Sequence, residues 1–118
     1  MIQGKCKNEL PSSRVSIWVD VRDAALAHVK AIETPAAANK RFFVAGGHFS
    51  NQEIANSIRD NFPEYRNVLP ESAPAGGDPP ERAYEYDNSR TREMLGIKFR
   101  SLEESIVDTV KSLKEVGV

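Results

Sequence analysis

Residues 41–47 (RFFVAGG) constrain the fold more than any other part of the sequence. Four apolar residues, 42–45, are consecutive and are followed by a glycine pair that stops a strand. Because these residues do not alternate with polar ones, we expect a strand that is buried on both faces. Such a strand needs neighbours on both sides, which favours a layered α/β arrangement.

The pattern around this strand alternates short strands with helices. Val15, Ile17 and Val19 alternate with other residues and predict a first strand over 15–19. The other expected elements are a helix over 21–32 capped by Asp20, a helix from 51 to about 61 after a capping box at Ser50, a short strand over 83–87, a helix over 88–95 ended by Gly96, and a helix from 102 to Gly117 after a second capping box at Ser101.

Two of these helices show apolar faces. On the helix over 21–32, Ala25, Val29 and Ile32 form a stripe that we expect to face the core. The last helix carries Leu102, Ile106, Val110 and Leu113 on one face. We therefore predict an α/β fold with few short strands and four helices, in a single domain over 1–118 with a long Pro- and Gly-rich loop over 63–82. The strands are too few for a complete sheet, so the chain resembles part of a larger protein.

The composition excludes several classes of function. Sixteen Lys and Arg residues balance 17 Asp and Glu residues, for a net charge of −1, so no basic surface is expected to bind nucleic acid. The longest apolar run is far shorter than the roughly 20 residues of a transmembrane helix, so no membrane span is expected. The single cysteine, Cys6, cannot form an internal disulfide, which favours a reducing compartment such as the cytoplasm.

The candidate catalytic groups have structural interpretations that we favour. Asp20 and Asp23 share one helix face, where paired carboxylates can act as acid and base, but both also suit the start of a helix. His28 and His48 lie on different predicted elements without a second metal ligand at useful spacing. We expect Tyr86 not to be catalytic, and we interpret the scattered arginines as solvent-exposed.

Three segments resemble, in order, the C-terminal part of extended short-chain dehydrogenases/reductases. The first, 17–28 (IWVDVRDAALAH), resembles the family's aromatic-Val-Asp-Val-x-Asp-x-Ala-x-Ala-His signature. The others are 41–47 with 50–54 (SNQEI), similar to the family's late strand and following helix, and 87–90 (DNSR) with 95–99 (LGIKF) and 101–105 (SLEES), similar to its closing segment. Within the family, the sequence looks most like fungal NADP-dependent aldehyde/ketone reductases of the methylglyoxal reductase and dihydroflavonol reductase type.

The resemblance implies a segment of a longer Rossmann-type reductase in which NADP reduces a small carbonyl substrate. It also implies that Ser16, Ile17 and Trp18 bind substrate, since they match the place where sugar-nucleotide epimerases typically carry Arg-Asp-Tyr. That arginine grips a diphosphate, and its absence argues against an epimerase segment. An apolar Ile17 suits an aliphatic or aromatic carbonyl compound.

The family's cofactor loop, catalytic Ser and Tyr-x-x-x-Lys pair do not occur in the sequence. We therefore expect no catalytic, cofactor-binding or metal-binding residue here, and neither activity nor nicotinamide binding for this chain alone. An alternative is a noncatalytic interaction module that uses the strand edge at 42–45. Because that strand lacks neighbours, we expect either a homodimer or a missing N-terminal segment to cover it.

Overall fold

The computed structural model describes residues 1–5, 7–8, 10, 16–70 and 84–118. In chain order, the described part contains β1 (Ile17–Trp18), α1 (Val21–Glu33), the 3₁₀ helix η1 (Pro35–Ala37), β2 (Gly47–His48), α2 (Asn51–Asn61), the 3₁₀ helix η2 (Pro63–Val68), α3 (Ser89–Leu95) and α4 (Leu102–Glu115). The four predicted helices are therefore present, together with a two-stranded sheet, as expected for a Rossmann-type α/β fragment.

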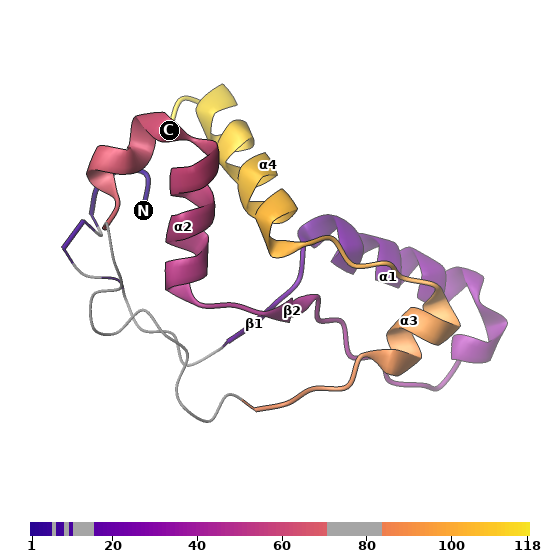
Figure 1. Ribbon diagram of the computed structural model, residues 1–118. Helices are drawn as coiled ribbons and strands as arrows, with labels where there is room; N and C mark the ends of the chain where they lie inside the picture. The colour runs from indigo at the N-terminus through magenta and orange to yellow at the C-terminus, as the bar shows by residue number, and fades with distance from the viewer. Residues whose placement is uncertain (6, 9, 11–15, 71–83) are drawn as a thin grey trace.

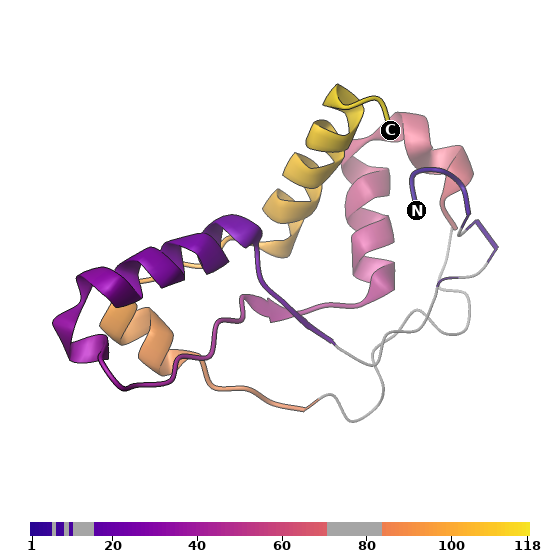
Figure 2. The same ribbon diagram turned by 180° about the vertical axis from the view of Figure 1, so that it is seen from behind.

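The helices form two groups on either side of the small sheet (Figures 1 and 2). In one group α2 packs against α4 and η2, and in the other α1 packs against α3 and η1. Between them β1 and β2 pair antiparallel, with Ile17 opposite His48 and Trp18 opposite Gly47. The sheet therefore lies at the junction of the two helical groups.

Each helical group has its own small apolar core. The first core consists of Ala27, Ala37, Leu95 and Ile97, and the second of Ile58, Phe62, Leu69 and Val110. The Cα radius of gyration is 16.6 Å, whereas about 13.5 Å is expected for a compact domain of this length. With extents of 51 × 36 × 18 Å, the molecule is flat and open.

The predicted helix caps are confirmed, except that the box at Ser101 is confirmed only in part: the Ser101 hydroxyl accepts a hydrogen bond from the Glu104 N–H. The Asp20 side chain accepts a hydrogen bond from the Arg22 backbone N–H at the start of α1. Ser50 and Glu53 form the reciprocal capping box of α2. Gly96 follows α3 with φ 65°, in the left-handed region that glycine adopts without strain.

The predicted strand over 42–45 is wrong. Within the described part of the chain no strand pairs with these residues, and β2 forms only at Gly47–His48. Alternate carbonyls of residues 41–45 are instead bound by side chains in or next to α3. Thr91 donates to Phe43 O and Asn88 to Ala45 O. Arg90 donates to Arg41 O. Side chains of α3 thus replace a strand along this edge.

Two further predictions differ in part from the structure. Residues 84–87 form no strand, and residue 83 lies outside the described residues. Pro63–Val68, at the start of the predicted loop, form η2, and residues 71–82 of that loop lie outside the description. Val15 of the first predicted strand also lies outside it, while Ile17 and Trp18 form β1.

The predicted inner face of α1 is also wrong. Val29 is 50% exposed and Ile32 is 87% exposed, whereas Ala27 on the opposite face is buried. Ala27 and its neighbour Ala31 pack towards α3 because small side chains let two helices approach closely. On α4 the expected face is confirmed, since Val110 is buried and Ile106 packs with it on the core shared with α2. Among the described residues, no helix is long and apolar enough to cross a bilayer.

Candidate functional site

The three predicted substrate-binding residues lie at the junction between the two helical groups. Ile17 and Trp18 form β1 and are partly exposed, whereas Ser16 just before them is buried. The segment is fixed by backbone hydrogen bonds on both sides: Phe49 N–H donates to Ser16 O and Gly46 N–H to Trp18 O, each over 2.7 Å. Position 17 is thus held rigidly at the surface, while the Ser16 hydroxyl is buried with no hydrogen-bond partner among the described residues.

The indole of Trp18 lies against the glycine pair. A Cβ atom at Gly46 would lie 3.5 Å from Trp18 Cζ2, and one at Gly47 would lie 3.4 Å from Trp18 Nε1. A Cβ atom at Gly47 would also lie 4.0 Å from the Tyr86 hydroxyl oxygen. The turn therefore brings Trp18 and Tyr86, which are far apart in the sequence, to one place.

An aromatic row extends from this point. The Tyr86 ring lies 5.0 Å from the His48 ring and 6.0 Å from the Phe43 ring, measured between centroids. His48 is anchored by its Nε2 atom, which lies 3.0 Å from Tyr84 O and donates to it in the Nε2-protonated tautomer. These contacts were not predicted, because no local spacing in the sequence indicates that residues 43, 48 and 86 meet.

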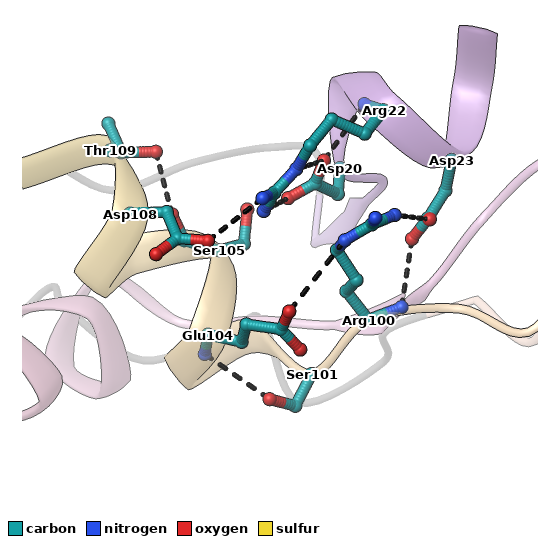
Figure 3. A network of polar contacts seen from close by, with 9 residues as sticks. All are labelled: Asp20, Arg22, Asp23, Arg100, Ser101, Glu104, Ser105, Asp108 and Thr109. Carbon is teal, nitrogen blue, oxygen red and sulfur yellow. Dashed lines mark hydrogen bonds and ion pairs between the residues drawn. The ribbon is translucent and has the colours of Figure 1, made fainter. Parts of the chain in front are cut away.

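The carboxylate of Asp20 belongs to an ion-pair network that joins α1 to α4 (Figure 3). The Arg22 guanidinium donates to Asp20 Oδ2 and to Asp108 Oδ2, each over 2.8 Å. Hydrogen bonds from the Arg22 side chain hold the pKa of the Asp20 carboxyl well below its usual range, and Asp20 in turn raises the pKa of Arg22. Asp20 is thus a cap and an ion-pair partner rather than an acid or base.

Asp23 makes a second connection between the elements. Its buried carboxylate accepts a hydrogen bond from the Arg100 backbone N–H at 2.8 Å and also pairs with the Arg100 guanidinium (Figure 3). Arg100 lies in the link between α3 and α4, so this pair fixes that link to the first turn of α1. The expected solvent exposure holds for Arg22, whereas Arg100 is only partly exposed, and the ion pairs of both arginines were not predicted.

A cleft of about 500 Å³ opens beside the Asp20 network, between the start of α1 and α4. Its charged side chains, Asp20, Arg22 and Asp108, bond to one another. The cleft therefore offers no unpaired acid or base. No group of three His, Cys, Asp or Glu side chains suited to a metal ion occurs in the described part of the chain.

Searches among known proteins find relatives of this chain, although no family model matches it. A ketoreductase of Aspergillus niger is 47% identical over 98 residues, covering 83% of this chain and 29% of that protein. A putative NADPH-dependent methylglyoxal reductase of Candida albicans is 35% identical over 111 residues, covering 90% of this chain and 33% of that protein. The chain thus spans about a third of the length of these relatives.

Solved structures show the same fold. The crystal structure of Gre2 from Candida albicans matches with a TM-score of 0.76 and 30% identity, over 97% of this chain and 35% of that one. The structure of Candida albicans Gre2 in complex with NADPH matches with a TM-score of 0.73 and 31% identity, over 92% of this chain and 33% of that one. These matches agree with the resemblance to a C-terminal segment that the motifs indicated.

Proposed function

We propose that this chain, a relative of the fungal NADPH-dependent carbonyl reductases in the extended short-chain dehydrogenase/reductase family, forms one wall of a reductase's substrate pocket. The substrate of that pocket is a carbonyl compound. The observation that carries the proposal is the similarity to the Aspergillus niger ketoreductase, 47% identity over 83% of this chain. The fold match to NADPH-bound Gre2 supports it independently.

The wall is formed by β1 and the aromatic row beside it. Ile17 and Trp18 present apolar surface, and the Trp18 indole rests on the Gly46–Gly47 turn. Phe43 and Tyr86 extend this surface. The backbone carbonyl of Ser16 accepts a hydrogen bond from the Phe49 N–H and so fixes the position of β1. Such a surface suits a small aliphatic or aromatic aldehyde or ketone, because apolar contacts dominate most small-molecule sites.

The described residues do not suit the cofactor itself. The glycine pair after residues 42–45 is the feature nearest to a phosphate-binding turn, but the Gly46 N–H already donates to Trp18 O and the indole lies against both glycines. In the proposed reductase, NADPH supplies the hydride and is bound by a part of the enzyme that this chain does not cover. This chain contributes the shape and polarity of the substrate side, in a cytoplasmic enzyme.

The proposal is tested by replacing the matching segment of Candida albicans Gre2 with this chain. We expect the chimera to reduce, with NADPH, a small aldehyde or ketone that the parent reduces, at a rate within about tenfold of the parent, since a tenfold change corresponds to only about 1.4 kcal/mol. A folded chimera, with the circular dichroism and NADPH affinity of the parent but without reductase activity towards any aldehyde or ketone, would contradict the proposal. The 118-residue chain alone is the control, and we expect it to be inactive.

A further inference from the structure

The connection between β1 and α1 is very short. Only Val19 and Asp20 separate the two elements. Asp20 is the N-cap of α1, and its side chain is 4% exposed. Because the connection is so short, the position of Asp20 limits where Trp18, the last residue of β1, can lie. A contact that fixes Asp20 therefore also fixes the end of β1.

The Arg22 side chain makes contacts that the helix cap does not require. The cap uses only the Arg22 backbone N–H, which donates to Asp20 Oδ1 over 2.8 Å. The guanidinium adds two hydrogen bonds to Asp20, from Nε to Oδ1 over 2.9 Å and from Nη2 to Oδ2 over 2.8 Å. Its third nitrogen, Nη1, donates to Asp108 Oδ2 on α4 over 2.8 Å. All three nitrogens thus form one bridge from the end of β1 to α4.

A second attachment begins in the same turn of α1. The side chain of Asp23 is 1% exposed, and its carboxylate accepts a hydrogen bond from the Arg100 backbone N–H over 2.8 Å and pairs with the Arg100 guanidinium. Arg100 lies two residues before the start of α4 at Leu102. Figure 3 shows both attachments at the start of α1. Two attachments at different points fix the orientation of this turn as well as its distance from α4.

The bridge from Arg22 to Asp108 is expected to contribute little to stability. The two side chains are 43% and 41% exposed, and solvent weakens ion pairs between exposed groups. Its geometry is more specific than its energy, because the planar fork of an arginine binds carboxylates in fixed directions. The contacts therefore suit a role in placing β1 better than a role in stabilising the fold.

We propose that Arg22 positions β1 for substrate binding by bridging Asp20 to Asp108. Without the bridge, the end of β1 shifts relative to the glycine turn on which the Trp18 indole rests. Arg22 acts through β1 and not by contact with the substrate. The position of Trp18 follows from the contacts alone, whereas its consequence for a substrate rests on the proposed function. The two parts are therefore tested separately.

Trp18 is the single tryptophan of the chain, so its fluorescence reports on β1 directly. In the unmodified 118-residue background, we expect Asp108→Asn to increase acrylamide quenching of Trp18 by at least about 1.5-fold, with the same far-UV circular dichroism. Arg22→Lys should act in the same direction, because a lysine ammonium lacks the fork that reaches both carboxylates. Asp108→Glu keeps a carboxylate on α4 and should restore most of the original protection.

Glu33→Gln is the matched control. It removes the carboxylate of another exposed ion pair of α1, in which Lys30 Nζ lies 3.5 Å from Glu33 Oε2. We expect it to leave the quenching of Trp18 unchanged. The midpoint of thermal unfolding of Asp108→Asn and of Glu33→Gln should each lie within about 3 °C of the original chain, because both pairs are exposed.

The chimera with Candida albicans Gre2 tests the consequence for the substrate. There we expect Asp108→Asn to raise the KM for an aldehyde by about 3- to 10-fold, with kcat and the KM for NADPH within about twofold, because only the substrate side is displaced. Asp108→Glu should recover the original KM, and Glu33→Gln should not change it.

The outcomes separate this proposal from the proposed function. Equal quenching of Trp18 in all variants would overturn the role of Arg22. So would an active chimera in which Asp108→Asn leaves the KM for the aldehyde unchanged. An inactive unsubstituted chimera would contradict the proposed function, and the fluorescence of the chain itself would then decide whether Arg22 positions β1.

Discussion

At the scale of single residues, Asp20 shows how one side chain serves two purposes. It caps α1 and binds the Arg22 guanidinium, which continues to Asp108 on α4. The cap could be predicted, because capping depends on residues within one turn. The contact with α4 could not, because Arg22 and Asp108 are 86 positions apart and no local pattern connects them.

The lowered pKa of Asp20 predicts a specific acid sensitivity. An unfolded aspartate has a pKa of about 3.9, so as the pH falls below about 4 the unfolded chain binds a proton at this position before the folded chain does. The stabilisation is therefore fully present above about pH 5 and is lost as the pH falls towards the lowered pKa of the folded chain. We expect Asp20→Asn to weaken the pH dependence of the free energy of unfolding in acid.

Asparagine keeps the helix cap, so this variant isolates the charge. At neutral pH we expect the free energy of unfolding of Asp20→Asn to be lower by about 1–2 kcal/mol. The loss is no larger because Arg22 is partly exposed and solvent screens its ion pairs. Urea unfolding between about pH 2.5 and pH 7 measures both effects. Asp60→Asn, at an exposed position on α2, is the control. An identical pH dependence for both variants and the original chain would show that Asp20 carries no such linkage.

At the scale of elements, the buried face of α1 was predicted wrongly. The helix is apolar on two opposite faces, one made of alanines and one of larger branched residues. Periodicity identifies both faces but does not say which one the neighbouring α3 covers. The alanine face is buried because close packing with α3 requires small side chains, and the branched face remains uncovered.

This arrangement predicts that a lysine is tolerated on one face of α1 and destabilises the chain on the other. Ile32→Lys is expected to change the free energy of unfolding by no more than about 0.5 kcal/mol, because Ile32 is 87% exposed. Ala27→Lys is expected to cost more than about 3 kcal/mol or to unfold the chain, because it places a charge in the core shared with α3. Denaturant titration of both variants measures the difference. Equal destabilisation by the two would contradict the observed orientation of α1.

The segment 42–45 shows a related limit. A run of consecutive apolar residues favours a buried strand, but strand pairing depends on a neighbour that the sequence does not specify. Here Thr91, Asn88 and Arg90 satisfy one edge with side chains. Their roles could not be predicted, since such side-chain bonds follow from the position of α3 and not from the strand itself.

At the scale of the whole molecule, the order of the motifs indicated the fold better than the count of elements did. The Aspergillus niger ketoreductase matches over 83% of the chain and the Candida albicans Gre2 structure over 97%, as the ordered motifs predicted. The contacts of the site were less accessible to sequence reasoning. Trp18 was identified by resemblance. Tyr86 and His48 come close to the Gly46–Gly47 turn, on which Trp18 rests, only because β1 and β2 pair and residues 84–86 pass beside them.

The two small cores and the flat shape give the site its position. β1 lies between the helical groups, and the ion pairs of Asp20 and Asp23 fix α1 to α4 and to the link that precedes it. Ile17 therefore lies at this junction, and its side chain is partly exposed. The proposed role of Ile17 in the substrate pocket depends on this position.

Substitution of Ile17 in the chimera with Candida albicans Gre2 tests whether this side chain lines the substrate pocket. We expect Ile17→Arg to lower kcat/KM for small apolar aldehydes by roughly 10- to 100-fold, mainly through KM, because an unpaired charge would face an apolar substrate. The KM for NADPH should remain within about twofold, since Ile17 is placed on the substrate side. Val116→Arg, at an exposed site after α4, should leave both unchanged. A folded Ile17→Arg chimera with unaltered kcat/KM for aldehydes would contradict the assignment.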